Sequence, residues 1–109
     1  MKVTIEGLES YLSELYANKV DEQSLFMKLV EEIGETAEIL NKRSGRKKAD
    51  SEDLDIQLGN ELADVIHYVV AIAAVNKLNF NDIILRKDKK AALKYNRDIN
   101  LEQFISSKR

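Results

Sequence analysis

Apolar residues recur at intervals of three and four along most of the chain, which is the period of helices that bury one face. The first such stretch follows Thr4 and the second follows Asp21, and both residue types commonly cap helix N-termini. The second stretch ends at about Lys42. The two predicted helices carry these apolar positions: Leu8, Tyr11, Leu12, Leu15 and Tyr16 in the first, and Leu25, Phe26, Leu29, Ile33, Ala37 and Leu40 in the second.

A third apolar pattern follows Ser51, which we expect to cap it, and continues to about Val75. Its second half, VIHYVVAIAAV, is apolar on almost all sides. A helix of this kind has to be covered from several directions, and a small monomer offers little cover. The pattern therefore predicts that this helix lies at a subunit interface, in a dimer at least.

The rest of the chain is more polar. The stretch NKRSGRKKADSED predicts a connection between the second and third helices. A break with N-capping character, from Asn79 to Asn81, precedes a basic helix expected from about Asp82 to Asn96. Leu101, Phe104 and Ile105 suggest a short helix in the tail. The chain has no proline and four glycines, which favours long helices. Together these patterns predict one all-α domain over residues 1–109, resembling a four-helix bundle and dimeric or higher.

Charge and composition limit the classes of partner. The chain has 17 basic and 19 acidic residues and a net charge of -2, which predicts no binding to nucleic acid or to an anionic membrane. It contains no cysteine and begins without a signal-peptide pattern. We therefore expect a cytoplasmic protein whose electrostatic features are local.

Two pairs of acids accompany the apolar faces of the second and third helices. At 100° per residue, Glu32 falls at the edge of the apolar face of its helix, and Glu35 lies about 60° further round. Glu61 projects close to apolar positions of the third helix, and Asp64 shares its side with Tyr68. Each helix thus directs two acids, three residues apart, at or beside its packing face.

Carboxylates that gather in a partly dry site need neutralisation, because burial and mutual repulsion both disfavour the charged forms. Protons, a lysine or divalent cations could supply it. An all-oxygen cluster suits Mg²⁺, or Mn²⁺ in its place, better than zinc. The stretch EEIGE alone is common on solvated helices, and the metal-site interpretation depends on the second pair, in ELAD, on a separate helix.

Residues 25 to 75 closely resemble the MazG-type nucleotide pyrophosphohydrolases, all-α enzymes with the signature E-E-x-x-E, a variable spacer and E-x-x-D. Here the two parts are EEIGE and ELAD, separated by 25 residues. The resemblance implies that Glu32, Glu35, Glu61 and Asp64 bind magnesium, and that the chain hydrolyses nucleoside triphosphates to the monophosphate and pyrophosphate. Glu31 is then a solvated residue, a group that supports the metal ligands without binding the ion, or a base for the attacking water.

The basic helix offers candidate phosphate contacts, although such a helix is usually only a solvated face. Members of the family carry lysine, asparagine and arginine in the corresponding segment, so the resemblance implies substrate contacts by Lys87, Lys94, Asn96 and Arg97. Lys28 lies one turn before Glu32 and could either pair with that acid or contact phosphate.

Several alternatives remain at this stage. The subunits could form a homodimer or a homotetramer. A phosphoribosyl-ATP pyrophosphohydrolase would have similar acidic motifs and fold, and a non-catalytic helical interaction module would leave the acids solvated or paired with Lys28. Among the aromatic side chains, Tyr68 is the best candidate for a site. His67 points to the polar side of its helix, which predicts a surface or interface residue.

Overall fold

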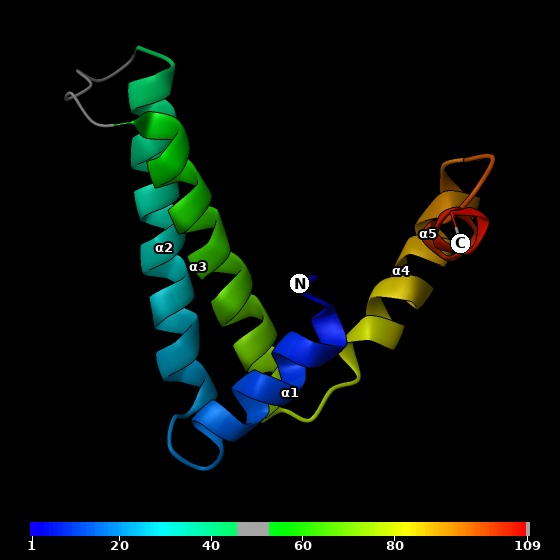
Figure 1. The fold of residues 1–109 in the computed structure, drawn as a ribbon, viewed down its shortest axis with the longest axis horizontal. Coiled ribbons are helices and arrows are strands. Elements are labelled where there is room, and N and C mark those ends of the chain that lie inside the picture. Colours follow the sequence, from blue (N-terminus) through cyan, green and yellow to red (C-terminus); the bar gives the residue numbers. More distant parts are fainter. Residues whose placement is uncertain (46–52, 109) are drawn as a thin grey trace.

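Five α-helices make up the computed structural model, which describes residues 1–45 and 53–108 (Figure 1). No strand occurs within these ranges, so the predicted all-α class is confirmed. The helices are α1 (Ile5–Tyr16), α2 (Glu22–Arg43), α3 (Leu54–Val75), α4 (Phe80–Lys94) and α5 (Leu101–Ser107).

Side chains cap most of the helices where the sequence predicts. The Thr4 hydroxyl accepts a hydrogen bond from the Gly7 amide at 2.9 Å, and Asp21 accepts one from the Ser24 amide at 2.7 Å. The first turn of α3 is capped instead by Asp53, whose Oδ1 accepts from two following amides. Ser51, the predicted cap, lies outside the described residues.

α4 begins and ends two residues earlier than predicted. Asn79 is its N-cap and accepts a hydrogen bond from the Asp82 amide at 3.3 Å, so the helix begins at Phe80. It ends at Lys94, because Asn96 has a φ of 53° and cannot continue a right-handed helix. The predicted tail helix forms as α5, and its first amide, of Leu101, donates to Asp88 of α4 at 2.6 Å.

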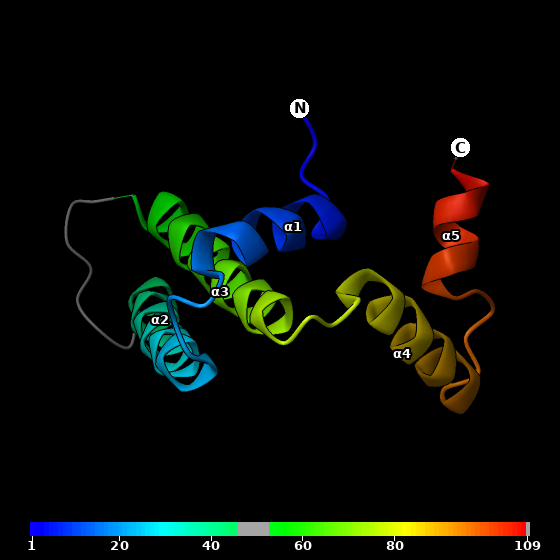
Figure 2. The ribbon, with the colours of Figure 1, turned by 90° about the horizontal axis from the view of Figure 1, so that it is seen from below.

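α2 and α3 form an antiparallel hairpin, and α1 crosses the side of α3 that faces away from α2 (Figures 1 and 2). The core lies where the three helices meet, near the C-terminal end of α3. Alanines at this end of α3 let α1 approach closely, because they carry the smallest apolar side chain. The fully buried residues of this core cluster are Leu12, Leu25, Val70, Ala71 and Ala74.

The face of α2 that contacts α3 differs from the one predicted. Leu25 and Ile39 are buried, whereas Ile33 and Leu40, expected near the centre of the apolar face, are 52% and 47% exposed. Glu32 immediately precedes Ile33 in the sequence and lies on the same side of α2 as the buried Leu25 and Ile39. The expectation that it lies at the edge of the buried face is therefore wrong, because the buried line of α2 runs directly through it.

α4 and α5 form an arm that leads away from the hairpin (Figures 1 and 2). Over the described residues, α4 contacts α1, α3 and α5 and does not contact α2. The radius of gyration is 17.0 Å, against roughly 13 Å for a compact domain of this length. A single chain therefore does not close into a four-helix bundle by itself.

α3 is long and apolar enough to cross a membrane by length and composition alone. In the described structure it packs against α1 on one side and α2 on the other, and it carries Glu61 and Asp64 at mid-length. The core helix of an apolar domain has the same features, so this property gives weak support to a membrane span.

Candidate metal centre

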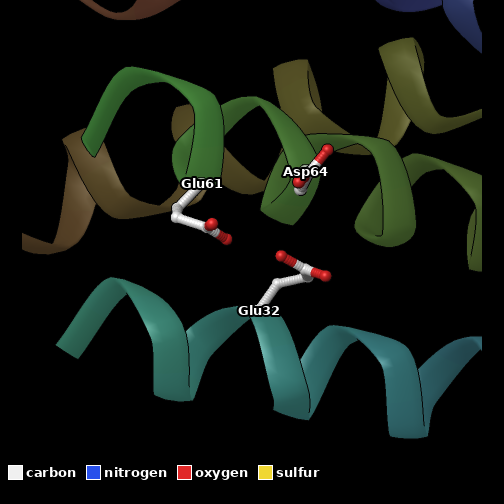
Figure 3. A group of neighbouring side chains, drawn as sticks. All are labelled: Glu32, Glu61 and Asp64. Atoms are coloured by element: carbon white, nitrogen blue, oxygen red, sulfur yellow. The ribbon is translucent and has the colours of Figure 1, made fainter. Parts of the chain in front are cut away.

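Three carboxylates meet between α2 and α3 (Figure 3). Glu32 extends from α2 towards Glu61 and Asp64, which lie one turn apart on α3, and one carboxylate oxygen of each residue lies within 4.8 Å of the others. The antiparallel packing of the hairpin sets this arrangement, because it places the middle of α2 opposite the middle of α3. The structure thus brings together three of the four predicted metal ligands.

Two of these carboxylates have buried oxygens. Glu32 and Glu61 are half-buried, and the Oε2 atom of each is shielded from solvent without a hydrogen-bond partner. Asp64 is exposed at the open side of the cluster. Burying a polar oxygen without a partner costs free energy of about 1–3 kcal/mol, and more for a charged group. Both glutamates therefore have binding capacity that their own chain does not use.

The protonation of Glu61 reflects this crowding. The adjacent carboxyl group of Glu32 raises the pKa of Glu61 to about 7, and burial of the Glu61 carboxyl group adds to the rise. Glu35 raises this pKa further through its closeness and its charge. Glu35, the fourth predicted ligand, therefore lies beside Glu61. Without a cation, a proton on Glu61 relieves the repulsion between the acids.

The donor set fits a hard divalent cation. Carboxylate oxygens are the ligands that Mg²⁺ and Mn²⁺ prefer, and a cation would satisfy both buried Oε2 atoms, of Glu32 and Glu61. The exposed side chains of Asp64 and Glu35 leave the cluster accessible from one side. Oxygen ligands, buried and unpartnered atoms, and an open side are the features that a metal site for a phosphate substrate requires.

Lys28 and Glu31 lie outside this cluster. Lys28 Nζ is 3.4 Å from Glu31 Oε2, and both side chains are exposed. Of the two alternatives for Lys28, the pair with Glu32 is therefore not formed, since the lysine reaches the neighbouring acid. An exposed ion pair of this kind contributes little stability, so both groups remain available for other contacts. A catalytic role for Glu31 stays a prediction.

The predicted substrate-binding residues of the basic segment are not brought to the acids within one chain. Lys87 and Lys94 lie on α4, and Asn96 and Arg97 follow it, whereas the acids lie on α2 and α3. Arg97 Nη1 is 3.3 Å from Asp88 Oδ1 of α4. This guanidinium therefore helps to hold the segment between α4 and α5 against α4. The roles of these four residues in substrate binding stay predictions.

The sequence did not reveal the environment of His67. Its Nε2 is 2.6 Å from the hydroxyl of Tyr16, and its ring meets the rings of Tyr16 and Tyr68 edge-on, with centroids 5.7 and 4.9 Å away. His67 is half-buried, because α1 covers the side of α3 that we expected to face solvent. Burial also raises the pKa of Tyr16. The sequence feature that could have indicated this contact is the apolar pattern of the first helix, which ends at Tyr16.

A family model described as the MazG nucleotide pyrophosphohydrolase domain matches residues 20–97, which include α2, α3 and α4. The chain belongs to this family. Both acidic motifs, and therefore all members of the carboxylate cluster, lie inside the matched region. Comparison with curated proteins gave no significant match. The resemblance noted in the sequence is thus confirmed at the level of the MazG domain.

Proposed function

We propose that this MazG-family chain is a Mg²⁺-dependent pyrophosphohydrolase that cleaves a nucleoside or deoxynucleoside triphosphate, in the cytoplasm, to the monophosphate and pyrophosphate. Mn²⁺ would be a working substitute. The observation that carries the proposal is the pair of buried, unpartnered oxygens of Glu32 and Glu61 beside the exposed carboxylate of Asp64. A family of nucleotide pyrophosphohydrolases provides the reaction that such a cluster would serve.

Four acids would hold the ion: Glu32 and Glu61 from the buried side, and Glu35 and Asp64 from the open side. When bound, Mg²⁺ supplies positive charge that offsets the charge of the phosphate groups and makes water more acidic. The hairpin positions these ligands on two packed helices, so little rearrangement is needed when the ion binds. Hydrolysis by water then requires no covalent nucleophile from the chain, in agreement with the absence of cysteine.

Glu31 is our candidate general base. It directly precedes Glu32 in α2, and its exposed carboxylate can accept a proton from a water that attacks the α-phosphorus. Lys28, which pairs with Glu31 at 3.4 Å, would hold this carboxylate or contact a phosphate oxygen. Glu31 and Lys28 are exposed and lie apart from the buried acids, so both can contact solvent and substrate.

Positive charge for the triphosphate would come from the basic segment. The nucleotide tail carries several negative charges, and lysine and arginine side chains bind such groups through charge-assisted hydrogen bonds. The proposed contacts are Lys87, Lys94, Asn96 and Arg97.

The products of hydrolysis provide the direct test. Purified protein is incubated with Mg²⁺ and a panel of ordinary and modified nucleoside triphosphates, with phosphoribosyl-ATP included, and pyrophosphate and orthophosphate are measured separately. We expect pyrophosphate and the monophosphate, and loss of both in Glu35→Gln and Asp64→Asn. Glu102→Gln, an exposed acid of α5, is the matched control. Orthophosphate as the only initial product, or no turnover of any substrate, would contradict the proposal.

A further inference from the structure

The arm begins where three helices meet. α4 follows α3 after a connection of residues 76–79, and α1 lies beside the beginning of α4 (Figures 1 and 2). We call this place, where α1, the end of α3 and the beginning of α4 contact one another, the joint. The side chain of Phe80, the first residue of α4, packs against the core cluster. Apolar contact therefore attaches the arm to the rest of the chain.

A carboxylate of α1 contacts the same end of α4. Glu9 Oε1 accepts a hydrogen bond from the Phe80 amide at 3.3 Å, and the two residues are 71 positions apart in the sequence. The first amides of a helix have no partner within the helix, and the Asn79 side chain accepts from the amide of Asp82. Two side chains thus cap α4, one from the connection and one from a distant helix.

The two contacts made by Phe80 constrain the arm differently. Apolar contact has no preferred direction, so packing of the Phe80 ring alone would allow α4 to tilt. The hydrogen bond to Glu9 is directional, because the amides of a first turn point along the helix axis. Glu9 therefore constrains the direction of α4 as well as its attachment. Its other oxygen, Oε2, is buried without a hydrogen-bond partner among the described residues.

The joint has space beside it. A hollow of about 430 Å³ lies between α1 and the connection, and Glu9, Glu14, Lys77 and Asn79 are among the residues that line it. Over the described residues, α4 has no contact with α2 that could hold the arm in one direction. The direction of the arm within one chain therefore depends on the contacts at the joint.

A small tilt at the joint displaces the far end of the arm by several ångströms. Lys87 and Lys94 follow Phe80 by seven and fourteen residues, so they lie about 10 and 21 Å further along α4. A tilt of roughly 15° at Phe80 would move Lys94 by about 5 Å. Displacement of a substrate-positioning group by only about 1 Å can slow an enzyme by about 10²-fold. The direction of α4 thus matters to any substrate contact that the arm makes.

We propose that Glu9 is a positioning residue of the active site. By capping α4 from α1, its carboxylate fixes the direction in which the arm presents Lys87 and Lys94 to the phosphate groups of the substrate. The contact with substrate rests on the proposed function, whereas the alignment of the arm by Glu9 does not. Glu9 lies outside the carboxylate cluster and acts through α4.

Steady-state kinetics with a nucleoside triphosphate test the consequence for the substrate. Loss of a cap would lower the population of aligned arms by up to about 30-fold, so Glu9→Ala should raise KM by up to that factor. kcat should stay within about twofold of the native value, because bound substrate selects the aligned arm. Glu9→Gln keeps an oxygen that can accept from Phe80, and it should recover part of the loss.

Glu14→Ala is the matched control for these measurements. Glu14 is an exposed acid of α1 that lines the same hollow, and its replacement should leave KM and kcat at their native values. A native KM in Glu9→Ala, or a defect confined to kcat, would overturn the proposal.

Distances within one chain test the alignment without reference to activity. The chain has no cysteine, so Gln23→Cys in α2 and Lys90→Cys in α4, both exposed positions, allow two spin labels to be attached. Doubly labelled chains are diluted with excess unlabelled protein and measured by double electron–electron resonance. We expect a narrow distance distribution with Glu9 or with Glu14→Ala, and a broader or shifted one with Glu9→Ala. Equal distributions for native protein and Glu9→Ala would overturn the proposal.

Two further outcomes separate the possible failures. If the native protein hydrolyses no nucleotide, the proposed function fails, and the distance measurement alone decides whether Glu9 aligns the arm. If Glu9→Ala loses its helical circular dichroism, Glu9→Gln takes its place in both experiments, because it has nearly the same shape and lacks the charge. A native KM together with a native distance distribution in Glu9→Gln would then overturn the proposal.

Discussion

Glu32 of α2 and Glu61 of α3 lie opposite each other in the hairpin, and each has a buried Oε2 without a hydrogen-bond partner. The closeness of the Glu32 carboxyl group raises the pKa of Glu61 to about 7. Two acids in this arrangement are unfavourable for the folded chain on its own and favourable for a bound cation. The hairpin thus gives up stability at the point where it would bind metal.

Glu61 makes the stability of the metal-free protein depend on pH. Its pKa is about 7 in the folded state and 4.5 in the unfolded state, so the folded state binds the additional proton between these values. Stability from this group is therefore fully present below pH 4.5 and is lost as the pH rises through 7. We expect Glu61→Gln to flatten this part of the stability profile, measured by urea unfolding between pH 5 and 8 in the presence of a chelator. An unchanged slope in the variant would contradict the assignment.

Mg²⁺ should raise the melting temperature at neutral pH. An ion that binds only the folded state stabilises it by about 2.7 kcal/mol at a concentration one hundred times its Kd. Differential scanning fluorimetry with increasing Mg²⁺ or Mn²⁺ should show this rise in the native protein. It should be lost when Glu35→Gln and Asp64→Asn are combined. Glu102→Gln, on α5, should respond as the native protein does. Equal responses of the double variant and the native protein would place the ion elsewhere.

Glu31 and the metal ligands should be separable by kinetics. If Glu31 is the general base, Glu31→Gln should lower kcat by about 10²–10⁴-fold, the usual contribution of such a group. Because Glu31 lies outside the carboxylate cluster and pairs with Lys28, the rise in melting temperature on adding Mg²⁺ should remain. A variant with native kcat would exclude the catalytic role, and one that no longer responds to Mg²⁺ would make Glu31 a ligand.

The contact between Tyr16 and His67 should stabilise the attachment of α1 to α3. Tyr16→Phe removes a half-buried hydrogen bond of 2.6 Å and should lower the free energy of unfolding by about 0.5–1.5 kcal/mol. Tyr11→Phe is the matched control, since Tyr11 lies on the same helix and is 60% exposed. Urea titrations at constant pH provide the measurement. Equal unfolding midpoints for both variants would mean that this hydrogen bond contributes no net stability.

Helical periodicity was sufficient to predict the elements. The caps at Thr4, Asp21 and Asn79 were visible because a short polar side chain before an apolar period is a local signal. The end of α4 lies two residues before the predicted one, because an asparagine occurs both inside helices and in the left-handed conformation that Asn96 adopts just after this one. Caps and apolar periods depend only on residues that are close together in the sequence, so a single sequence is enough to recognise them.

The faces of the helices were harder to predict than their bounds. α2 carries apolar residues over a wide arc, and the sequence did not show whether Ile33 or Ile39 faces α3. In the structure Ile39 is buried and Ile33 is exposed, and the difference moves Glu32 from the edge to the middle of the contact. His67 was misjudged for the same reason, since α1 covers a side of α3 that has a polar residue.

The sequence by itself determined the helices, their order and the two pairs of acids, because spacing along one helix follows from the sequence alone. Only the tertiary structure decided which acids meet: antiparallel packing of α2 and α3 places Glu32 against Glu61 and Asp64, with two oxygens buried. It also showed that α4, which carries basic residues, leads away from the hairpin and does not contact α2 within one chain. Proximity between elements depends on how their faces pack, and that choice is a property of the whole fold.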